Sequence, residues 1–239
     1  LLPIGAKPAL LYVVEEAVAA DVRDVVLVCS PQKRHLADLF APNPELTAQL
    51  AAKGKQRAVA ELSRIESLAT VRVAIQRQPL GLGDAIRCAK ALVGNRPFAV
   101  ALPDVLMQGR QAGLPELVHH PCAGWRLLLE EVTAQQVEAY GVIAGVRQAD
   151  GTYRIERAIE KPSPDTAPSR LAIAGRYCFP PEIFAILDGA TTGALGEIQL
   201  TDAINTLAQR QPGFGIVSRG RICDIGTPEG MAKAYRDFV

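Results

Sequence analysis

Two aspartates of this sequence follow apolar runs that have the length of β-strands. Asp104 comes after the run 98–102, and Asp224 comes after residues 221–223 and before Gly226. In α/β proteins ligands bind at the carboxyl edge of the sheet, and Mg²⁺ takes one or two protein carboxylates together with phosphate oxygens. Either aspartate alone is more typical of a turn or a helix cap. As a pair they give the hypothesis of a Mg²⁺ site that serves a phosphorylated ligand.

A short glycine motif, Gly81-Leu82-Gly83, joins a predicted strand to a predicted helix. Glycine lets the backbone approach a ligand closely, and the amino end of a helix favours anions. The same pattern is also common in tight turns that bind nothing. Gln78, just before the motif, could read the edge of a base through its amide or could be a solvated loop residue. Both readings stay open at this point.

Another group of candidates surrounds one predicted hairpin. Glu160 and Lys161 close its second strand. A carboxylate beside an ammonium can hold the hydroxyls and the phosphate of a sugar phosphate respectively. The alternative is a surface ion pair before a proline-rich turn. Tyr140-Gly141 stands at the entry to the first strand, where it either brings a backbone amide to a ligand or simply begins the strand.

The first half of the chain alternates between strand and helix patterns. Apolar runs at 25–29, 71–75 and 98–102 predict strands, and the stretch 45–68 predicts helix with Gly54 as its weak point. Such alternation indicates βαβ units and a mostly parallel sheet with helices on its faces. The ends of these strands therefore become the place to look for chemistry.

The second half of the chain favours hairpins. The segments 142–146 and 153–159 flank Asp150-Gly151, whose residue types suit the positive backbone angles of a hairpin turn. The segments 214–217 and 221–224 predict a second, hairpin-like pair. Hairpin strands are therefore expected as additions to the parallel sheet.

The composition is that of an ordinary globular protein without a strong charge. Hydrophobic residues make up 49% of the chain, charged residues 21%, and the net charge is +1. No global field favours nucleic acid or an anionic membrane, and no apolar run is long enough to span a bilayer. The five cysteines are scattered, which indicates buried, reduced thiols in a cytoplasmic protein. We expect a single domain over residues 1–239.

Sequence blocks spread in order along the chain resemble the bacterial UTP–glucose-1-phosphate uridylyltransferases of the nucleotide-sugar pyrophosphorylase superfamily. The most specific blocks are Ala167-Pro168-Ser169, Leu171-Ala172-Ile173, Gly175-Arg176-Tyr177 and Gly196-Glu197-Ile198-Gln199-Leu200-Thr201-Asp202-Ala203-Ile204. Further matches are Leu2-Pro3-Ile4, Lys7-Pro8, Leu80-Gly81-Leu82-Gly83, Leu102-Pro103-Asp104-Val105, Tyr140-Gly141-Val142-Ile143 and Glu160-Lys161-Pro162. The resemblance implies a Rossmann-like nucleotidyltransferase fold with a mixed, mostly parallel sheet.

The reaction that this resemblance implies is UTP plus glucose 1-phosphate giving UDP-glucose and pyrophosphate, with Mg²⁺. By position, Gln78 and Gly83 would contact the uracil end of the nucleotide. Asp104 would hold Mg²⁺, and Asp224 would be the second candidate ligand. In-line attack on the α-phosphorus brings two polyanions together, so catalysis consists mainly of positioning and charge neutralisation.

The sugar side of the site is implied in the same way. The residues that would line the glucosyl pocket are Tyr140, Gly141, Glu160 and Gly175. Lys161 would hold the phosphate of the sugar phosphate. Glu197 lies in a matching block whose contribution is partly structural. The resemblance also implies a homodimer or a homotetramer.

The chain departs from the family pattern in ways that bear on function. We expect the family's glycine-rich loop, with its Arg and Lys, and the first sheet strand to precede Leu1 in the full protein. Gly5-Ala6 stands where the family usually has an acidic residue before Lys7-Pro8. The stretch 224–229 is more similar to thymidylyl- and guanylyltransferases than to the uridylyltransferase pattern. The alternatives are therefore a glucose-1-phosphate thymidylyltransferase and a non-catalytic regulatory paralogue.

Overall fold

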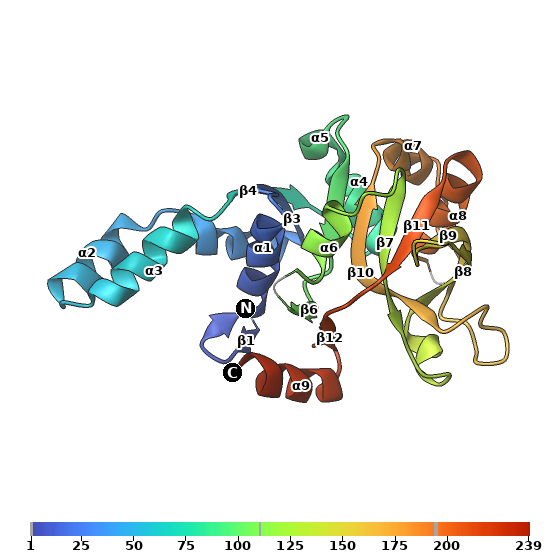
Figure 1. The fold of residues 1–239 in the computed structure, drawn as a ribbon. Coiled ribbons are helices and arrows are strands. Elements are labelled where there is room, and N and C mark those ends of the chain that lie inside the picture. Colours follow the sequence, from blue (N-terminus) through green and yellow to red (C-terminus); the bar gives the residue numbers. More distant parts are fainter. Residues whose placement is uncertain (1, 110, 194–195) are drawn as a thin grey trace.

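The computed structural model describes residues 2–109, 111–193 and 196–239. Its largest sheet has six strands (Figure 1). In spatial order its strands are β5 (Phe98–Ala101), β10 (Leu171–Phe179), β7 (Trp125–Glu131), β11 (Gly213–Val217), β9 (Tyr153–Glu160) and β8 (Gly141–Arg147). Further two-stranded pairs are β1 (Pro3–Ile4) with β2 (Lys7–Pro8), β3 (Asp24–Cys29) with β4 (Thr70–Ile75), and β6 (Val105–Gln108) with β12 (Arg221–Asp224).

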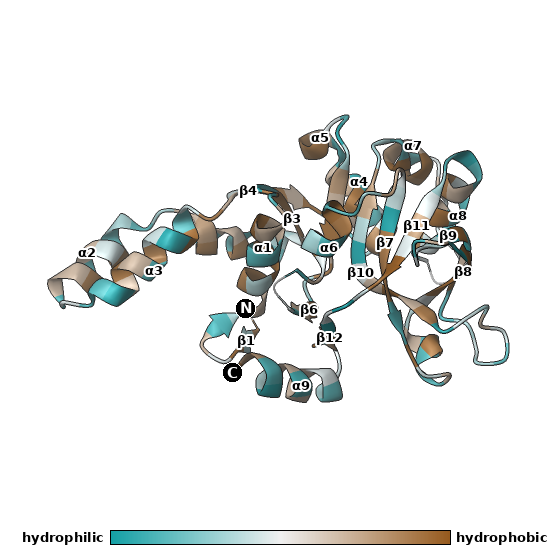
Figure 2. Cartoon of the chain, viewed as in Figure 1, coloured by the Kyte–Doolittle hydropathy of each residue, from teal (hydrophilic) through white to brown (hydrophobic). Residues whose placement is uncertain are grey.

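Helices cover the sheet and also extend away from it. They are α1 (Ala9–Ala19), α2 (Pro44–Ala52), α3 (Gln56–Glu66), α4 (Leu82–Cys88), α5 (Lys90–Val93), α6 (Leu114–Val118), α7 (Glu182–Asp188), α8 (Leu200–Arg210) and α9 (Pro228–Phe238), with 3₁₀ segments at Pro31–Phe40 and Gln136–Ala139. Hydrophobic residues concentrate where α4, α6 and α7 pack near the sheet (Figure 2). In the described ranges none of these helices combines the length and the apolar character that a membrane span requires.

The predicted α/β fold with a mixed sheet is confirmed, but the prediction that its strands are mostly parallel is wrong. Among the described strands, β7 and β11 form a parallel pair inside the six-stranded sheet, and β3 with β4 forms another. The remaining pairings are antiparallel; β10, for example, runs against β5, β7 and β8. The reason is that β10 follows the β8–β9 hairpin directly, without the crossover helix that a parallel connection requires.

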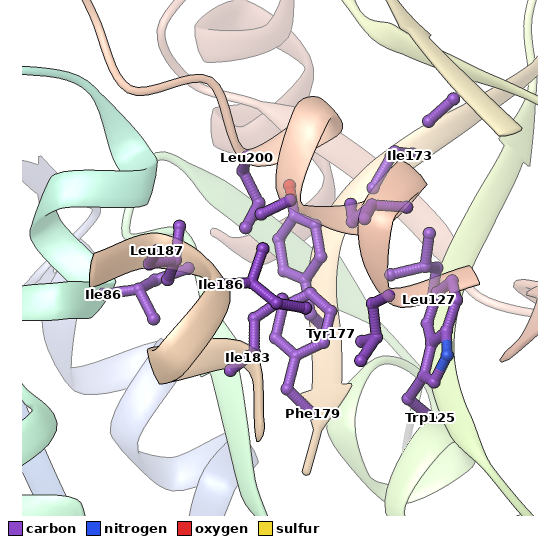
Figure 3. Close-up of a cluster of buried hydrophobic side chains, with 14 of the residues drawn as sticks. Ile86, Trp125, Leu127, Ile173, Tyr177, Phe179, Ile183, Ile186, Leu187 and Leu200 are labelled. Atoms are coloured by element: carbon purple, nitrogen blue, oxygen red, sulfur yellow. The ribbon is translucent and has the colours of Figure 1, made fainter. Parts of the chain in front are cut away.

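The main core lies between the six-stranded sheet and the helices α4, α7 and α8 (Figure 3). Trp125, Leu127, Tyr177 and Phe179 point from the sheet toward Ile183 on α7 and are almost fully buried. Alternating residues of a strand share one face, so β7 presents Trp125, Leu127 and Leu129 to this layer. A second apolar layer packs on the opposite face, where Leu128, Cys178 and Ile216 cluster with Leu117 of α6.

Between β3 and β5 the structure contains an apolar slot of about 890 Å³, which we call the β3–β5 slot. It is lined by residues of β3 and β5 together with apolar side chains of α1, such as Val13 and Val14. The run 25–29 was expected to be covered on both faces, yet Val25–Val28 are only half-buried because they face this slot.

The first predicted hairpin is confirmed. β8 and β9 pair antiparallel from Gly141 opposite Glu160 to Arg147 opposite Tyr153, with a register shift between Ala144 and Gly145. Gly151 adopts a φ of +88° at the turn, as the sequence predicted. The hairpin thus places Tyr140, Gly141, Glu160 and Lys161 together at its open end.

The second predicted hairpin is wrong. β11 runs parallel to β7 and antiparallel to β9, whereas β12 leaves the sheet and pairs with β6. The Ser218 amide continues the pairing with β7 by donating to the Leu129 carbonyl at 2.8 Å, so the segment after β11 does not turn back. Because β12 pairs with β6, Asp224 lies opposite Val105, the first residue of the strand that follows Asp104.

The helical stretch 45–68 is broken at its predicted weak point. Gly54 has a φ of +69°, and α2 and α3 form a helical pair that projects from the body (Figure 1). Among these two helices only Ile65 is buried. The pair is therefore an arm with little core of its own, and it contributes no residue to the site described next.

Candidate active site

The two strand-end aspartates lie side by side. Asp104 follows β5, and Asp224 is the last residue of β12, opposite Val105 in the β6–β12 pair. The Ile225 amide donates to the Asp104 carbonyl at 2.8 Å. A Cβ atom placed on Gly226 would lie 3.1 Å from Asp224 Oδ1 and 3.6 Å from Asp104 Oδ2, so both carboxylates border one small space.

Both aspartates line a cavity of about 290 Å³, which we call the aspartate pocket. The predicted site residues that line it are Asp104, Tyr140, Lys161, Gly175 and Asp224. The Tyr140 hydroxyl donates to Asp224 Oδ2 at 3.2 Å. Burial, with the nearby Asp224 carboxylate as a second cause, raises the pKa of Tyr140 to about 12. Tyr140 therefore acts as a neutral hydrogen-bond donor at physiological pH.

Lys161 reaches the aspartate pocket from a special backbone conformation. It follows β9 with a φ of +45°, which is uncommon for a residue other than glycine. Its amide donates to the Tyr140 carbonyl at 3.0 Å, and this bond extends the hairpin pairing by one step. The turn leaves the Lys161 side chain exposed on the pocket wall, where its ammonium can meet an anion.

Glu160 lies next to Gly141 across the hairpin. A Cβ atom on Gly141 would sit 3.2 Å from Glu160 Oε2 and 3.1 Å from Thr201 Cγ2, so glycine keeps this space open. Burial is the main cause that raises the pKa of Glu160, while Lys161 and a hydrogen bond with Thr201 oppose the rise. A half-buried carboxylate with free acceptor capacity suits the recognition of hydroxyl groups.

The glycine motif forms a clamp on the segment that contains Glu197. The Gly83 amide donates to the Ile198 carbonyl at 3.0 Å, and the Ile198 amide donates to the Leu80 carbonyl at 2.7 Å. A Cβ on Gly83 would lie 2.6 Å from that Ile198 oxygen, which only glycine avoids. Gly81, with a φ of +90°, stands against Glu197. The motif thus has a packing role in addition to any contact with a ligand.

Gln78 is exposed on the loop before the clamp, and the described residues offer its side chain no hydrogen bond. The glutamine of this region whose side-chain amide is hydrogen-bonded is Gln76, which was not predicted from the sequence. Gln76 Nε2 donates to Asp84 Oδ2 at 2.9 Å and to the Gly81 carbonyl at 3.1 Å, and Asp84 is only 5% exposed. A strand-end Gln followed by an acid on the next helix was the signal that could have found this pair.

A further carboxylate, Glu130, lines the aspartate pocket and was also missed. Burial is the main cause that raises its pKa; the Lys233 ammonium opposes the rise, and the Asp224 carboxylate adds to it. The signal was present in the sequence, because Glu130 directly follows the apolar run 127–129 and is still half-buried within β7. A charged residue in a buried strand is rare unless it is paired or functional.

The donor set of the aspartate pocket fits a hard divalent cation that is shared with phosphate oxygens. In the parts of the chain that the structure describes, no group of three or more His, Cys, Asp or Glu forms a protein-only metal cage. Mg²⁺ rarely needs such a cage, since it keeps several waters and binds through one or two carboxylates plus substrate phosphates. Asp104 and Asp224 supply that number of carboxylates at one place.

Comparisons with known proteins identify the family of this chain. A family model described as nucleotidyl transferase matches residues 1–238. A UTP–glucose-1-phosphate uridylyltransferase of Bacillus subtilis is 37% identical over 241 residues, covering 100% of this chain and 82% of the relative. A UDP-glucose pyrophosphorylase solved with UDP-glucose superposes with a TM-score of 0.89 at 34% identity, covering 99% of this chain and 88% of the other. A UTP-bound enzyme from Acinetobacter baumannii gives 0.89 at 33% identity, covering 98% and 83%. The chain therefore belongs to the nucleotidyl transferase family.

Proposed function

We propose that this protein transfers the uridylyl group of UTP to glucose 1-phosphate, giving UDP-glucose and pyrophosphate. The observation that carries the proposal is the aspartate pocket, where paired carboxylates, a lysine and the hydroxyl of the half-buried Tyr140 face one cavity. The relatives that match over the whole chain carry this activity in their names, and one solved relative holds UDP-glucose while another holds UTP.

Asp104 and Asp224 would hold the divalent cation, which we assign as Mg²⁺; the family typically uses a divalent cation. When bound, the ion neutralises charge on the nucleotide phosphates as the second polyanion approaches. Tyr140 orients Asp224 through its hydroxyl hydrogen bond. Glu130 adds negative charge to the same wall and thereby favours a cation there.

On the sugar side, Lys161 would pair with the phosphate of glucose 1-phosphate, and Glu160 would accept hydrogen bonds from the sugar hydroxyls. Gly141 and Gly175 keep the backbone close to the ligand, and Gly175 needs its φ of +69° to do so. The attacking oxygen belongs to the substrate, so the protein does not have to supply a nucleophile. Its residues bind, orient and neutralise charge.

On the nucleotide side, Gln78 and Gly83 would contact the uracil. Glu197 would support the glycine motif by packing against Gly81. Gln78 is exposed and free to meet a base, whereas Gly83 is held by Ile198. The homodimeric or homotetrameric assembly and the cytoplasmic location stay predictions.

Pyrophosphate release by the full-length protein with UTP, dTTP, GTP and ATP, each with glucose 1-phosphate and Mg²⁺, tests the proposal. We expect UTP to give the highest kcat/KM. A clear preference for dTTP would replace uridylyl with thymidylyl transfer. Lack of turnover with every nucleotide would support the regulatory paralogue instead.

A further inference from the structure

A fully buried arginine lies directly behind the Asp104 loop. Arg176 is 0% exposed, and it forms an ion pair with Glu16 of α1, whose side chain is 11% exposed. A buried charge is strongly destabilising unless it is paired and fully hydrogen-bonded. Such a pair is therefore weak evidence for stability alone, and its other contacts show what else it organises.

The Arg176 guanidinium donates hydrogen bonds in two directions, to Glu16 and to backbone carbonyls of the site. Toward α1, Nε and Nη2 donate to the two carboxylate oxygens of Glu16, both at 2.8 Å. Toward the site, Nη1 donates to the Leu102 carbonyl at 3.1 Å and Nη2 donates to the Val105 carbonyl at 2.7 Å. These carbonyls bracket Asp104, so one planar group fixes both ends of the loop that presents this carboxylate.

Glu16 is itself held in place. Its Oε1 accepts a hydrogen bond from the Leu114 amide at 2.7 Å. A Cβ atom on Gly113, which has a φ of +76°, would lie 2.1 Å from the same oxygen, so glycine is required for this approach. The carboxylate thus receives two guanidinium donors and one amide, an arrangement that holds the arginine in one orientation.

We propose that Arg176, oriented by Glu16, is a positioning residue that sets the Asp104 carboxylate for its cation. The inference rests on the proposed cation-binding role of Asp104. Lysine cannot replace the arginine, because three donors on one flexible ammonium cannot bridge a carboxylate and two separate carbonyls in a plane. Groups behind a metal ligand commonly change metal affinity or activity by about 10- to 100-fold when they are removed.

The test compares Arg176→Lys with Arg170→Lys as a matched control. Arg170 also pairs with a glutamate, Glu131, at 2.9 Å, but both side chains are more than half exposed, at 61% and 63%. In the full-length enzyme we expect Arg176→Lys to raise the Mg²⁺ concentration for half-maximal rate by about 10- to 100-fold. Arg170→Lys leaves it unchanged.

A second readout does not depend on activity. The Ile225 amide donates to the Asp104 carbonyl, so its hydrogen exchange reports on the loop itself. We expect Arg176→Lys to accelerate exchange at Ile225 while the amides of β7 keep their protection. An unchanged Mg²⁺ dependence with unchanged Ile225 exchange would overturn the proposal. Uniformly faster exchange with a normal Mg²⁺ dependence would also overturn it, because that result assigns the pair to stability.

Glu16→Gln covers the case in which Arg176→Lys does not fold. This variant keeps Arg176 and its carbonyl bonds but removes the charge that orients it, so we expect a smaller rise in the Mg²⁺ requirement. Wild-type values would contradict the proposal. Asp104→Asn, measured in parallel, separates the two claims: if it keeps normal Mg²⁺ dependence, the role of Asp104 fails; if it loses activity while the Arg176 and Glu16 variants behave normally, only the present inference fails.

Discussion

Two cavities meet at Leu102, and they differ in almost every respect. The β3–β5 slot is the larger, at about 890 Å³, and its walls are mainly apolar. The aspartate pocket is about 290 Å³ and gathers Asp104, Glu130, Tyr140 and Asp224 around its wall. The contrast teaches that size alone does not locate chemistry here. The chemistry is located instead by the polar groups that converge on the aspartate pocket, where burial raises the pKa of Tyr140 and of Glu130.

The largest expected effect on activity comes from a substitution in the aspartate pocket. Asp104→Asn keeps the size of the side chain but removes the charge that would bind the cation. We expect kcat/KM to fall by about 100-fold or more, which is typical when an electrostatic contact to the transition state is lost. Steady-state pyrophosphate release measures this, with thermal unfolding as a control for folding. Activity within a few-fold of wild type would assign Asp104 to a turn.

Lys161→Gln tests the other side of the same pocket. Removing the ammonium should raise the KM for glucose 1-phosphate by about 30-fold, since a hydrogen bond to a charged group contributes roughly 2 kcal/mol. The KM for UTP should change much less, because Lys161 is assigned to the sugar phosphate. Kinetics with each substrate varied in turn provide the comparison. Equal losses for both substrates would contradict the assignment.

The slot should respond in stability and not in kinetics. Leu27 of β3 lines it and packs against the cluster of Leu11, Val14 and Ile65. Leu27→Ala should lower the free energy of unfolding by about 2 kcal/mol, the lower end for such truncations because Leu27 is only half-buried. Urea unfolding measures the change. A higher KM for either substrate in the folded variant would break the distinction between the two cavities.

The smallest effect concerns pH. Burial raises the pKa of Glu160, so its ionised, hydrogen-bond-accepting form is lost as pH falls through that raised value. Between about pH 8 and about pH 5 the KM for glucose 1-phosphate should therefore rise a few-fold in the wild type. Glu160→Gln should flatten this dependence. A pH profile that is identical in the two proteins would remove Glu160 from the sugar site.

The same shift has a defined sign for stability. A carboxyl whose pKa is raised in the folded state favours folding at low pH, and this contribution is lost as pH rises through the folded pKa. Glu160→Gln should thus be relatively more stable than the wild type on the alkaline side. Unfolding measured at several pH values checks this expectation.

Local patterns predicted the parts of the molecule that local chemistry decides. The β8–β9 hairpin was predicted because Asp150-Gly151 supplies the turn, and the break at Gly54 because glycine weakens a helix. The strand ends at Asp104 and Asp224 followed from apolar runs that stop. These features depend on residues within a few positions of one another.

Long-range partners were not predictable in this way. β12 was assigned to β11 because the two are adjacent in sequence, but its partner is β6, more distant along the chain. Arg176 stood in a recognised Gly-Arg-Tyr block, yet nothing near it identifies Glu16, which lies 160 residues away. Glu130 and Gln76 were overlooked because a single polar residue in or after a strand has many ordinary explanations.

The β8–β9 hairpin has a consequence for engineering. Its open end carries Tyr140, Gly141, Glu160 and Lys161, while its tip at Asp150-Gly151 lies at the other end of the ladder, beyond the register shift near Ala144. A Cβ atom at Gly151 would meet no neighbour within 4 Å. A short tag or a fluorophore placed at this tip would therefore sit on the hairpin that carries the sugar-side residues, at the end away from them.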